Sequence, residues 1–143
     1  MRISSIELHK EQHTLQEKPI EPDIETDSHY LFHLDPDKQP VGAYDYRKPF
    51  SNHHFILKSG DTIYLSSDGF RDQFGGTKGK KYMAKNFKQL LVSIQNKTMD
   101  EQQVFLQKNI HDWMGNEEQN DDICVIGVRV WNKSDVRSWK SGV

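Results

Sequence analysis

The alternation of apolar and polar residues predicts short strands in the first half of the chain. In the segment 29–34, Tyr30, Phe32 and Leu34 fall on one face of an extended backbone. Two further apolar runs, 53–58 and 62–67, flank a Ser-Gly-Asp turn, and this arrangement predicts a β-hairpin. Residues 3–8 fit either a short strand or part of a frayed helix, and the pattern does not decide between the two.

Helical spacing replaces this alternation after a glycine-rich loop at 68–79. Apolar residues recur every three or four positions in 83–94 and again in 99–113, which predicts two helices. Thr98 and Glu101 have the spacing of a capping box at the start of the second helix. The run 121–131 is apolar on both faces at its start, as in a strand that is covered on both sides. We therefore expect an α+β fold with this last strand inserted in the sheet.

The length of 143 residues corresponds to one domain. We divide it into a polar N-terminal segment of undecided structure (1–28), a folded domain (29–131) and a polar tail (132–143). The chain has 19 basic and 21 acidic side chains, so no basic excess favours nucleic acid. Its longest apolar run is too short to span a membrane, and its first residues lack the apolar stretch of a secretory signal. With a single cysteine, Cys124, the sequence predicts a cytoplasmic protein without a disulfide framework.

Two aspartates are the first candidates for chemistry. Asp68 ends a predicted strand in the sequence SSDG, and Asp121 precedes the final apolar strand. If these strands are neighbours, the two carboxylates converge at one end of a sheet, where their oxygens suit Mg²⁺ or Mn²⁺. A turn at Asp-Gly and a solvated Asp-Asp loop explain the same residues without a metal. Both interpretations stay open at this point.

The basic, glycine-rich stretch FGGTKGKKY is the second candidate. It lacks the Ser or Thr that ends a phosphate-binding P-loop. It is either a solvated loop or a mobile flap in which Lys78, Lys80 and Lys81 attract an anionic phosphosubstrate. The seven histidines have no metal-binding spacing, so we interpret them as surface or packing residues.

The order of the motifs resembles a known family. DKQPVG, SGDTIYLSSDGFRDQFGG, GKKYMAKNFKQLLVSIQNKTMDEQ and DDICVIGVRV follow one another between residues 37 and 130. Together they resemble the SpoIIE-like branch of the metal-dependent (PPM-type, protein phosphatase 2C-like) serine/threonine phosphatases. The resemblance implies a layered β-sandwich with flanking helices. It also implies a two-metal site for Mn²⁺ or Mg²⁺, at which a metal-activated water attacks the phosphorus.

The resemblance assigns roles to individual residues. It implies that Asp68 and Asp121 bind metal, and that Gly69 supports the turn beside Asp68. Asp72 would accept a hydrogen bond next to a metal ligand or cap a helix. Asp122 is a weaker candidate for a place beside the metal.

One motif of the family has no counterpart here. The bridging Asp-Gly pair lies N-terminal to all the matched motifs, and nothing in residues 1–36 resembles it. We therefore expect the C-terminal part of a phosphatase domain, without its first strands, and leave open whether this chain alone is an enzyme.

The family relationship implies a function and its partners. The implied task is to dephosphorylate phosphoserine or phosphothreonine on a regulatory protein similar to an anti-sigma-factor antagonist, with an upstream sensor domain as a further candidate partner. The alternative is a catalytically incomplete remnant that serves as a regulatory or protein-binding module. Exposed sheet edges and apolar faces would favour self-association.

Overall fold

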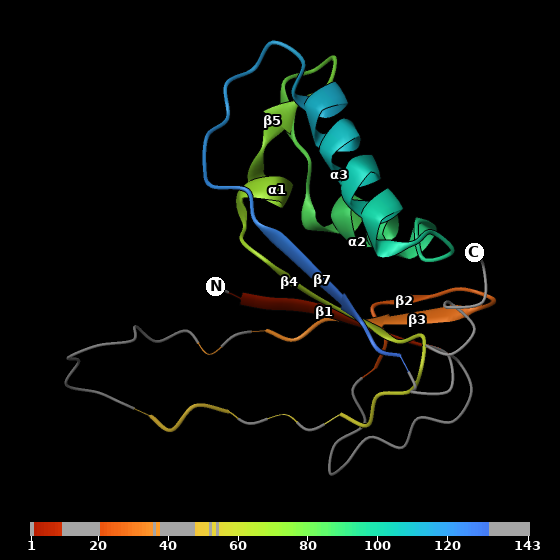
Figure 1. Cartoon of the computed structure of the whole chain (residues 1–143). Coiled ribbons are helices and arrows are strands. Elements are labelled where there is room, and N and C mark those ends of the chain that lie inside the picture. Colours follow the sequence, from red (N-terminus) through yellow and green to blue (C-terminus); the bar gives the residue numbers. More distant parts are fainter. Residues whose placement is uncertain are drawn as a thin grey trace, which may run out of the picture.

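An antiparallel sheet forms the base of the structure (Figure 1). The computed structural model describes residues 2–9, 21–35, 37, 48–51, 53 and 55–131, so the predicted tail 132–143 and most of the motif DKQPVG lie outside it. Within these residues the sheet has five strands, in the order β2 (Ile24–Glu25), β3 (His29–Phe32), β1 (Arg2–His9), β4 (Thr62–Ser66) and β7 (Val125–Arg129). The segment that fitted a strand or a helix is therefore strand β1, paired with both β3 and β4.

The helices lie on one face of this sheet (Figure 1). They are α1 (Gly69–Asp72), α2 (Ala84–Ser93) and α3 (Met99–Met114), and a small hairpin of β5 (Phe74–Gly75) and β6 (Lys80–Lys81) separates α1 from α2. Most of the apolar positions that predicted α2 and α3 form the main core with Tyr64 of β4. The buried members from the two helices are Phe87, Leu90, Leu91, Leu106 and Ile110. The predicted helices and the α+β class are confirmed.

The capping box at the start of α3 is confirmed as well. The Thr98 hydroxyl accepts the Glu101 N–H, and the Glu101 carboxylate accepts the Thr98 N–H at 2.8 Å. The backbone and hydroxyl hydrogen bonds from Thr98 lower the pKa of Glu101 below its ordinary value. These bonds satisfy N–H groups that have no partner inside the helix.

A buried polar network joins the turn between α2 and α3 to the sheet. The Tyr64 hydroxyl donates to Gln102 and accepts from Gln95 Nε2 at 2.6 Å. Gln102 Nε2 in turn donates to the Ile94 carbonyl at 3.1 Å, and Arg129 of β7 donates to the Gln95 carbonyl at 2.9 Å. Since Tyr64 and Gln102 are fully buried, these bonds replace the water that their polar groups lose on folding.

The predicted hairpin between 53–58 and 62–67 is wrong. The turn itself is present, because the buried Asp61 carboxylate accepts the Lys58 N–H at 2.7 Å. The described residues before it form no strand, however, and β4 pairs instead with β1 and β7. Phe55 and Leu57 pack on the face of the sheet opposite the helices, in a second apolar cluster around Phe32 and Leu34.

The final strand is also not the doubly covered strand that the sequence predicts. β7 occupies the edge of the sheet formed by the described residues, with β4 as its neighbour. Its helix-facing side is covered, because a Cβ on Gly127 would meet Met99 and Tyr64. Ile126 and Val128 are 40% and 54% exposed.

Among the described helices, none has the length and apolar character needed to cross a bilayer.

Candidate functional site

The pairing of β4 with β7 brings the two aspartate segments to the same end of the sheet. Ser66, the last residue of β4, lies opposite Val125, the first residue of β7. The strands are antiparallel, so the chain that leaves β4 towards Asp68 starts beside the chain that arrives from Asp121. The expectation that the two strands are neighbours is therefore correct.

Hydrogen bonds from Ser67 fasten these two segments together. Its N–H donates to the Cys124 carbonyl at 2.9 Å, and its hydroxyl donates to the Asp122 carbonyl at 2.6 Å. The same hydroxyl accepts the Cys124 N–H at 2.9 Å. Gly69 is buried against Asp122 so closely that a Cβ would lie 2.8 Å from the Asp122 carbonyl carbon. The backbone on either side of Asp68 thus rests on the backbone that follows Asp121.

The carboxylates of this site are accessible. Asp68 is 41% exposed and forms a loose ion pair with Arg71 at 3.9 Å. Asp121 and Asp122 are exposed, and the Asp121 carboxylate accepts the N–H of Asp122 at 2.7 Å. This bond fixes one carboxylate oxygen relative to the loop and leaves further lone pairs for a ligand.

The donor set fits a hard divalent cation in kind. Carboxylate oxygens, beside backbone carbonyls, are what Mg²⁺ and Mn²⁺ prefer. It is small in number, because in the described part of the chain no three His, Cys, Asp or Glu side chains gather closely enough to hold a metal ion. Hard-cation affinity depends on the number of carboxylates, so the two aspartates suit one weakly held ion better than a two-metal cluster.

Asp72 lies at the other end of α1. It is the last residue of that helix, and the residue before α2 is Met83, so the suggested role of Asp72 as a helix N-cap is wrong. Its carboxylate pairs with Lys81 Nζ at 3.4 Å, with both side chains 45% exposed. This pair links α1 to the β5–β6 hairpin.

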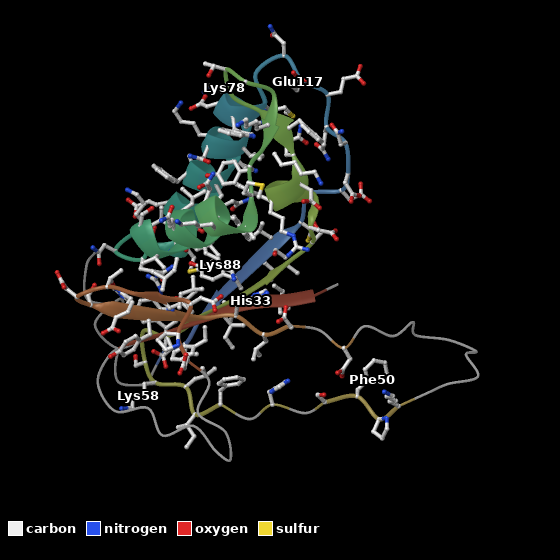
Figure 2. The ribbon with its side chains drawn as sticks, turned by 180° about the vertical axis from the view of Figure 1, so that it is seen from behind. His33, Phe50, Lys58, Lys78, Lys88 and Glu117 are labelled. Atoms are coloured by element: carbon white, nitrogen blue, oxygen red, sulfur yellow. The ribbon has the colours of Figure 1, made fainter. Side chains whose placement is uncertain are left out.

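The glycine-rich stretch forms this hairpin rather than an open loop. Gly76 and Gly79 have φ of +66° and +54°, in the region that glycine tolerates best, and they form its turn. The Gly76 N–H donates to the Trp113 carbonyl at 2.7 Å, so the start of the turn is attached to α3. Lys78 in the turn and Lys80 in β6 are exposed. Figure 2 shows Lys78 at the same end of the molecule as Glu117, which belongs to the loop before Asp121.

The sequence patterns do not predict the hydrogen-bonding roles of two residues of this region, Ser67 and Gln73. Ser67 was predicted only as the last residue of the strand 62–67, although it makes three hydrogen bonds to the other segment. Gln73 is 1% exposed and hydrogen-bonded to the loop before Asp121. The signal for Gln73 was its place in DQFGG, between the short helix and the glycines.

A groove of 430 Å³ between α3 and the β4–β7 pair is a separate feature. Leu106, Ile110 and Val125 contribute to its lining, and Asp100 is its one acidic side chain. It has neither the carboxylates nor the lysines of the region described above. The candidate metal ligands Asp68 and Asp121 therefore lie outside this groove, at the strand ends.

Comparison with known proteins identifies the family of the chain. The model of the family described as stage II sporulation protein E (SpoIIE) matches residues 24–131. The chain belongs to the SpoIIE family. This assigns it to the PPM-type protein phosphatases, whose members generally use Mn²⁺ or Mg²⁺.

A solved structure supports the relationship. The chain is similar to the SiaA-PP2C domain of Pseudomonas aeruginosa, with a TM-score of 0.64 and 25% sequence identity over 90% of this chain. The match covers 44% of that domain, so this SpoIIE-family chain spans less than half of the structure that it resembles. No curated protein sequence matches the chain.

Proposed function

We propose that this chain supplies part of the metal-binding site of a SpoIIE-like phosphatase that hydrolyses phosphoserine or phosphothreonine. The observation that supports this most is the contact of Ser67 and Gly69 with the backbone of Asp122, which joins the segments of Asp68 and Asp121. Asp68 and Asp121 would hold Mn²⁺ or Mg²⁺. Such an ion would lower the pKa of a bound water and offset negative charge on the phosphate.

The other residues of the site act on the ligands and on the substrate. The Asp122 N–H orients the Asp121 carboxylate, and Ser67 holds Asp122 in place through its carbonyl. Lys78 and Lys80 project from the hairpin and raise the local concentration of a phosphorylated substrate. Lys81 is shared with Asp72 and therefore contributes less charge to the substrate.

Family membership suggests the biological setting. The proposed substrate is a phosphorylated regulatory protein of the anti-sigma-factor-antagonist type, in the cytoplasm, with a sensor domain as a candidate upstream partner. The balanced charge of the chain is consistent with a protein substrate, since it favours neither nucleic acid nor an anionic membrane surface.

We expect little catalysis by the chain alone. A two-metal mechanism holds its ions about 3.5–4 Å apart and stabilises both the attacking and the leaving oxygen. Among the described residues no three His, Cys, Asp or Glu side chains gather closely enough to hold a metal ion, so we expect Asp68 and Asp121 to hold one ion and not the pair that this mechanism needs.

Mn²⁺ binding, followed by electron paramagnetic resonance, tests the proposal. D68N and D121N should each weaken binding at least about tenfold, while D23N, which removes a carboxylate paired with Lys88 at the other edge of the sheet, should leave binding unchanged. Equal binding by D68N, D121N and D23N would reject the metal site. Hydrolysis of an aryl phosphate, measured in parallel, should stay near background. Strong Mn²⁺-dependent turnover that D68N abolishes would show that the chain is a complete enzyme.

One observation favours a second candidate function, protein binding. The exposed Ile126 and Val128 lie on the edge strand of a sheet, and such edges pair readily with other strands. A second copy of this chain is the partner that we propose for this edge. Light scattering after size exclusion would detect it as a mass that rises with concentration, and a constant monomer mass would exclude it.

A further inference from the structure

Gln73 is held rigidly where α1 ends. Its carbonyl accepts the Tyr82 N–H at 2.9 Å and the Trp113 Nε1–H at 3.2 Å. Its side chain is directed inward and the residue is 1% exposed. A long polar side chain in such a place costs free energy unless its amide is fully hydrogen-bonded.

The side-chain amide of Gln73 forms hydrogen bonds with the loop that precedes Asp121. Its Nε2 donates to the Glu118 carbonyl at 2.8 Å and to the Phe74 carbonyl at 3.1 Å. Its Oε1 accepts the Asn120 N–H at 3.4 Å. Glu118 and Asn120 lie between α3 and β7, outside any helix or strand, and the Gln73 side chain bonds one backbone group of each.

Ser67 makes the matching attachment on the other side of Asp121. Its hydroxyl binds the Asp122 carbonyl and the Cys124 N–H. Asp121 therefore lies between Asn120, bound by Gln73, and Asp122, bound by Ser67. In the sequence, Asp68 and the short helix α1 lie between Ser67 and Gln73.

We infer that Gln73 and Ser67 are positioning residues that set Asp121 relative to Asp68. Neither would need to touch the metal, since each acts through the backbone next to a carboxylate. The inference rests on the proposed metal site for its functional meaning, but the attachment of the loop can be tested without metal. An apolar residue at position 73 would leave the Glu118 carbonyl and the Asn120 N–H without these partners, so the loop would loosen.

The experiment compares two buried glutamines. Q73M keeps the length of the side chain and removes its amide, and Q102M does the same to the equally buried Gln102 in the network under the helices. Ser67→Ala loosens the same loop from its other side without altering the core. Mn²⁺ affinity is measured by electron paramagnetic resonance per folded protein, and amide exchange of Asn120 is measured by NMR in the metal-free chain.

The expected results separate positioning from general stability. Q73M and S67A should weaken Mn²⁺ binding about tenfold and speed Asn120 exchange, while Q102M lowers global stability without either effect. Unchanged Asn120 exchange in Q73M would overturn the attachment. Faster exchange with unchanged Mn²⁺ affinity, in a chain where D68N abolishes binding, would overturn the positioning role. If the wild-type chain binds no Mn²⁺, the proposed metal site fails, and the exchange data alone decide whether Gln73 orders this loop.

Discussion

Replacing Gly69 by alanine tests how closely the two strand ends are packed. A Cβ at this position would lie 2.8 Å from the carbonyl carbon of Asp122, closer still to its oxygen, and 3.1 Å from Ile123 Cγ1. Ordinary contact begins near 3.4 Å, so the backbone of Asp122 would have to withdraw by at least about 0.6 Å. Gly69 is helical, so alanine itself adds no backbone strain.

The free-energy change follows from three terms. Overpacking against a backbone that is fixed on both sides costs about 1–3 kcal/mol. Displacing Asp122 also weakens its 2.6 Å hydrogen bond from Ser67, which contributes about 1 kcal/mol. Alanine lowers the conformational entropy of the unfolded chain, which offsets about 0.4–1 kcal/mol of this cost. We therefore expect G69A to lower the free energy of unfolding by about 1–3.5 kcal/mol.

Gly127 offers a matched control. A Cβ there would lie 2.6 Å from Met99 Cε and 3.1 Å from the Tyr64 ring, so its closest obstacle is the end of a flexible side chain. Met99 can turn aside, although Tyr64 is held by its hydrogen bonds. We expect G127A to cost about 0–1 kcal/mol, less than G69A.

Urea unfolding of both variants, with Mn²⁺ binding per folded protein, provides the comparison. G69A should also weaken Mn²⁺ binding, because the displaced Asp122 adjoins Asp121, whereas G127A should not. If G69A proves as stable as the wild type, or less destabilised than G127A, the close contact of the strand ends does not exist in solution.

Three further predictions concern other parts of the molecule. The hydrogen bonds from Thr98 lower the pKa of Glu101. The stability that they contribute is present above the unfolded pKa of Glu101, near 4.5, and is lost as the pH falls through its lower folded pKa. Urea unfolding between about pH 3 and pH 6 should therefore show a smaller loss of stability in acid for E101Q than for the wild type, and parallel curves would contradict this. Tyr64→Phe leaves the buried side-chain oxygen Oε1 of Gln102 without its hydroxyl donor. It should lower the free energy of unfolding by about 1–3 kcal/mol with unchanged Mn²⁺ affinity, whereas a loss below about 0.5 kcal/mol would show that the network adds little. Val128→Lys on the exposed edge should abolish any concentration-dependent rise in mass while leaving the fold intact, and an unaltered rise would place the self-association elsewhere.

The sequence was sufficient where structure depends on neighbours along the chain. The spacing of apolar residues located α2 and α3, and the Thr98–Glu101 pair located the start of α3. The turn before β4 was found for the same reason, because the Asp61 carboxylate bonds the Lys58 N–H three residues away. These interactions are encoded within a few positions, so their patterns are visible in the sequence.

Pairing between distant segments was predicted less well. The run 53–58 has apolar residues suited to a strand, yet Phe55 and Leu57 pack against Phe32 and Leu34 and do not pair with β4. An apolar run does not specify its partner, so tertiary packing decided against the local hairpin signal. The contribution of Gln73 was hidden for a related reason, since one polar residue in a glycine-rich stretch has no periodicity that marks it as buried.

Strand β7, at the edge of the described sheet, follows the proposed metal ligand Asp121 and carries the exposed residues Ile126 and Val128. Asp121 precedes this strand, and Ile126, 40% exposed, follows it by five positions, which is at most about 17 Å along an extended chain. A polypeptide that covers Ile126 and Val128 would therefore reach to within one strand length of the carboxylates. In the matched SiaA-PP2C domain, the part similar to this chain is 44% of the whole. Covering this face would bury Ile126 and Val128 and stabilise the strand, and for the metal site that we propose it would lower the local dielectric and strengthen the attraction between the two aspartates and the ion.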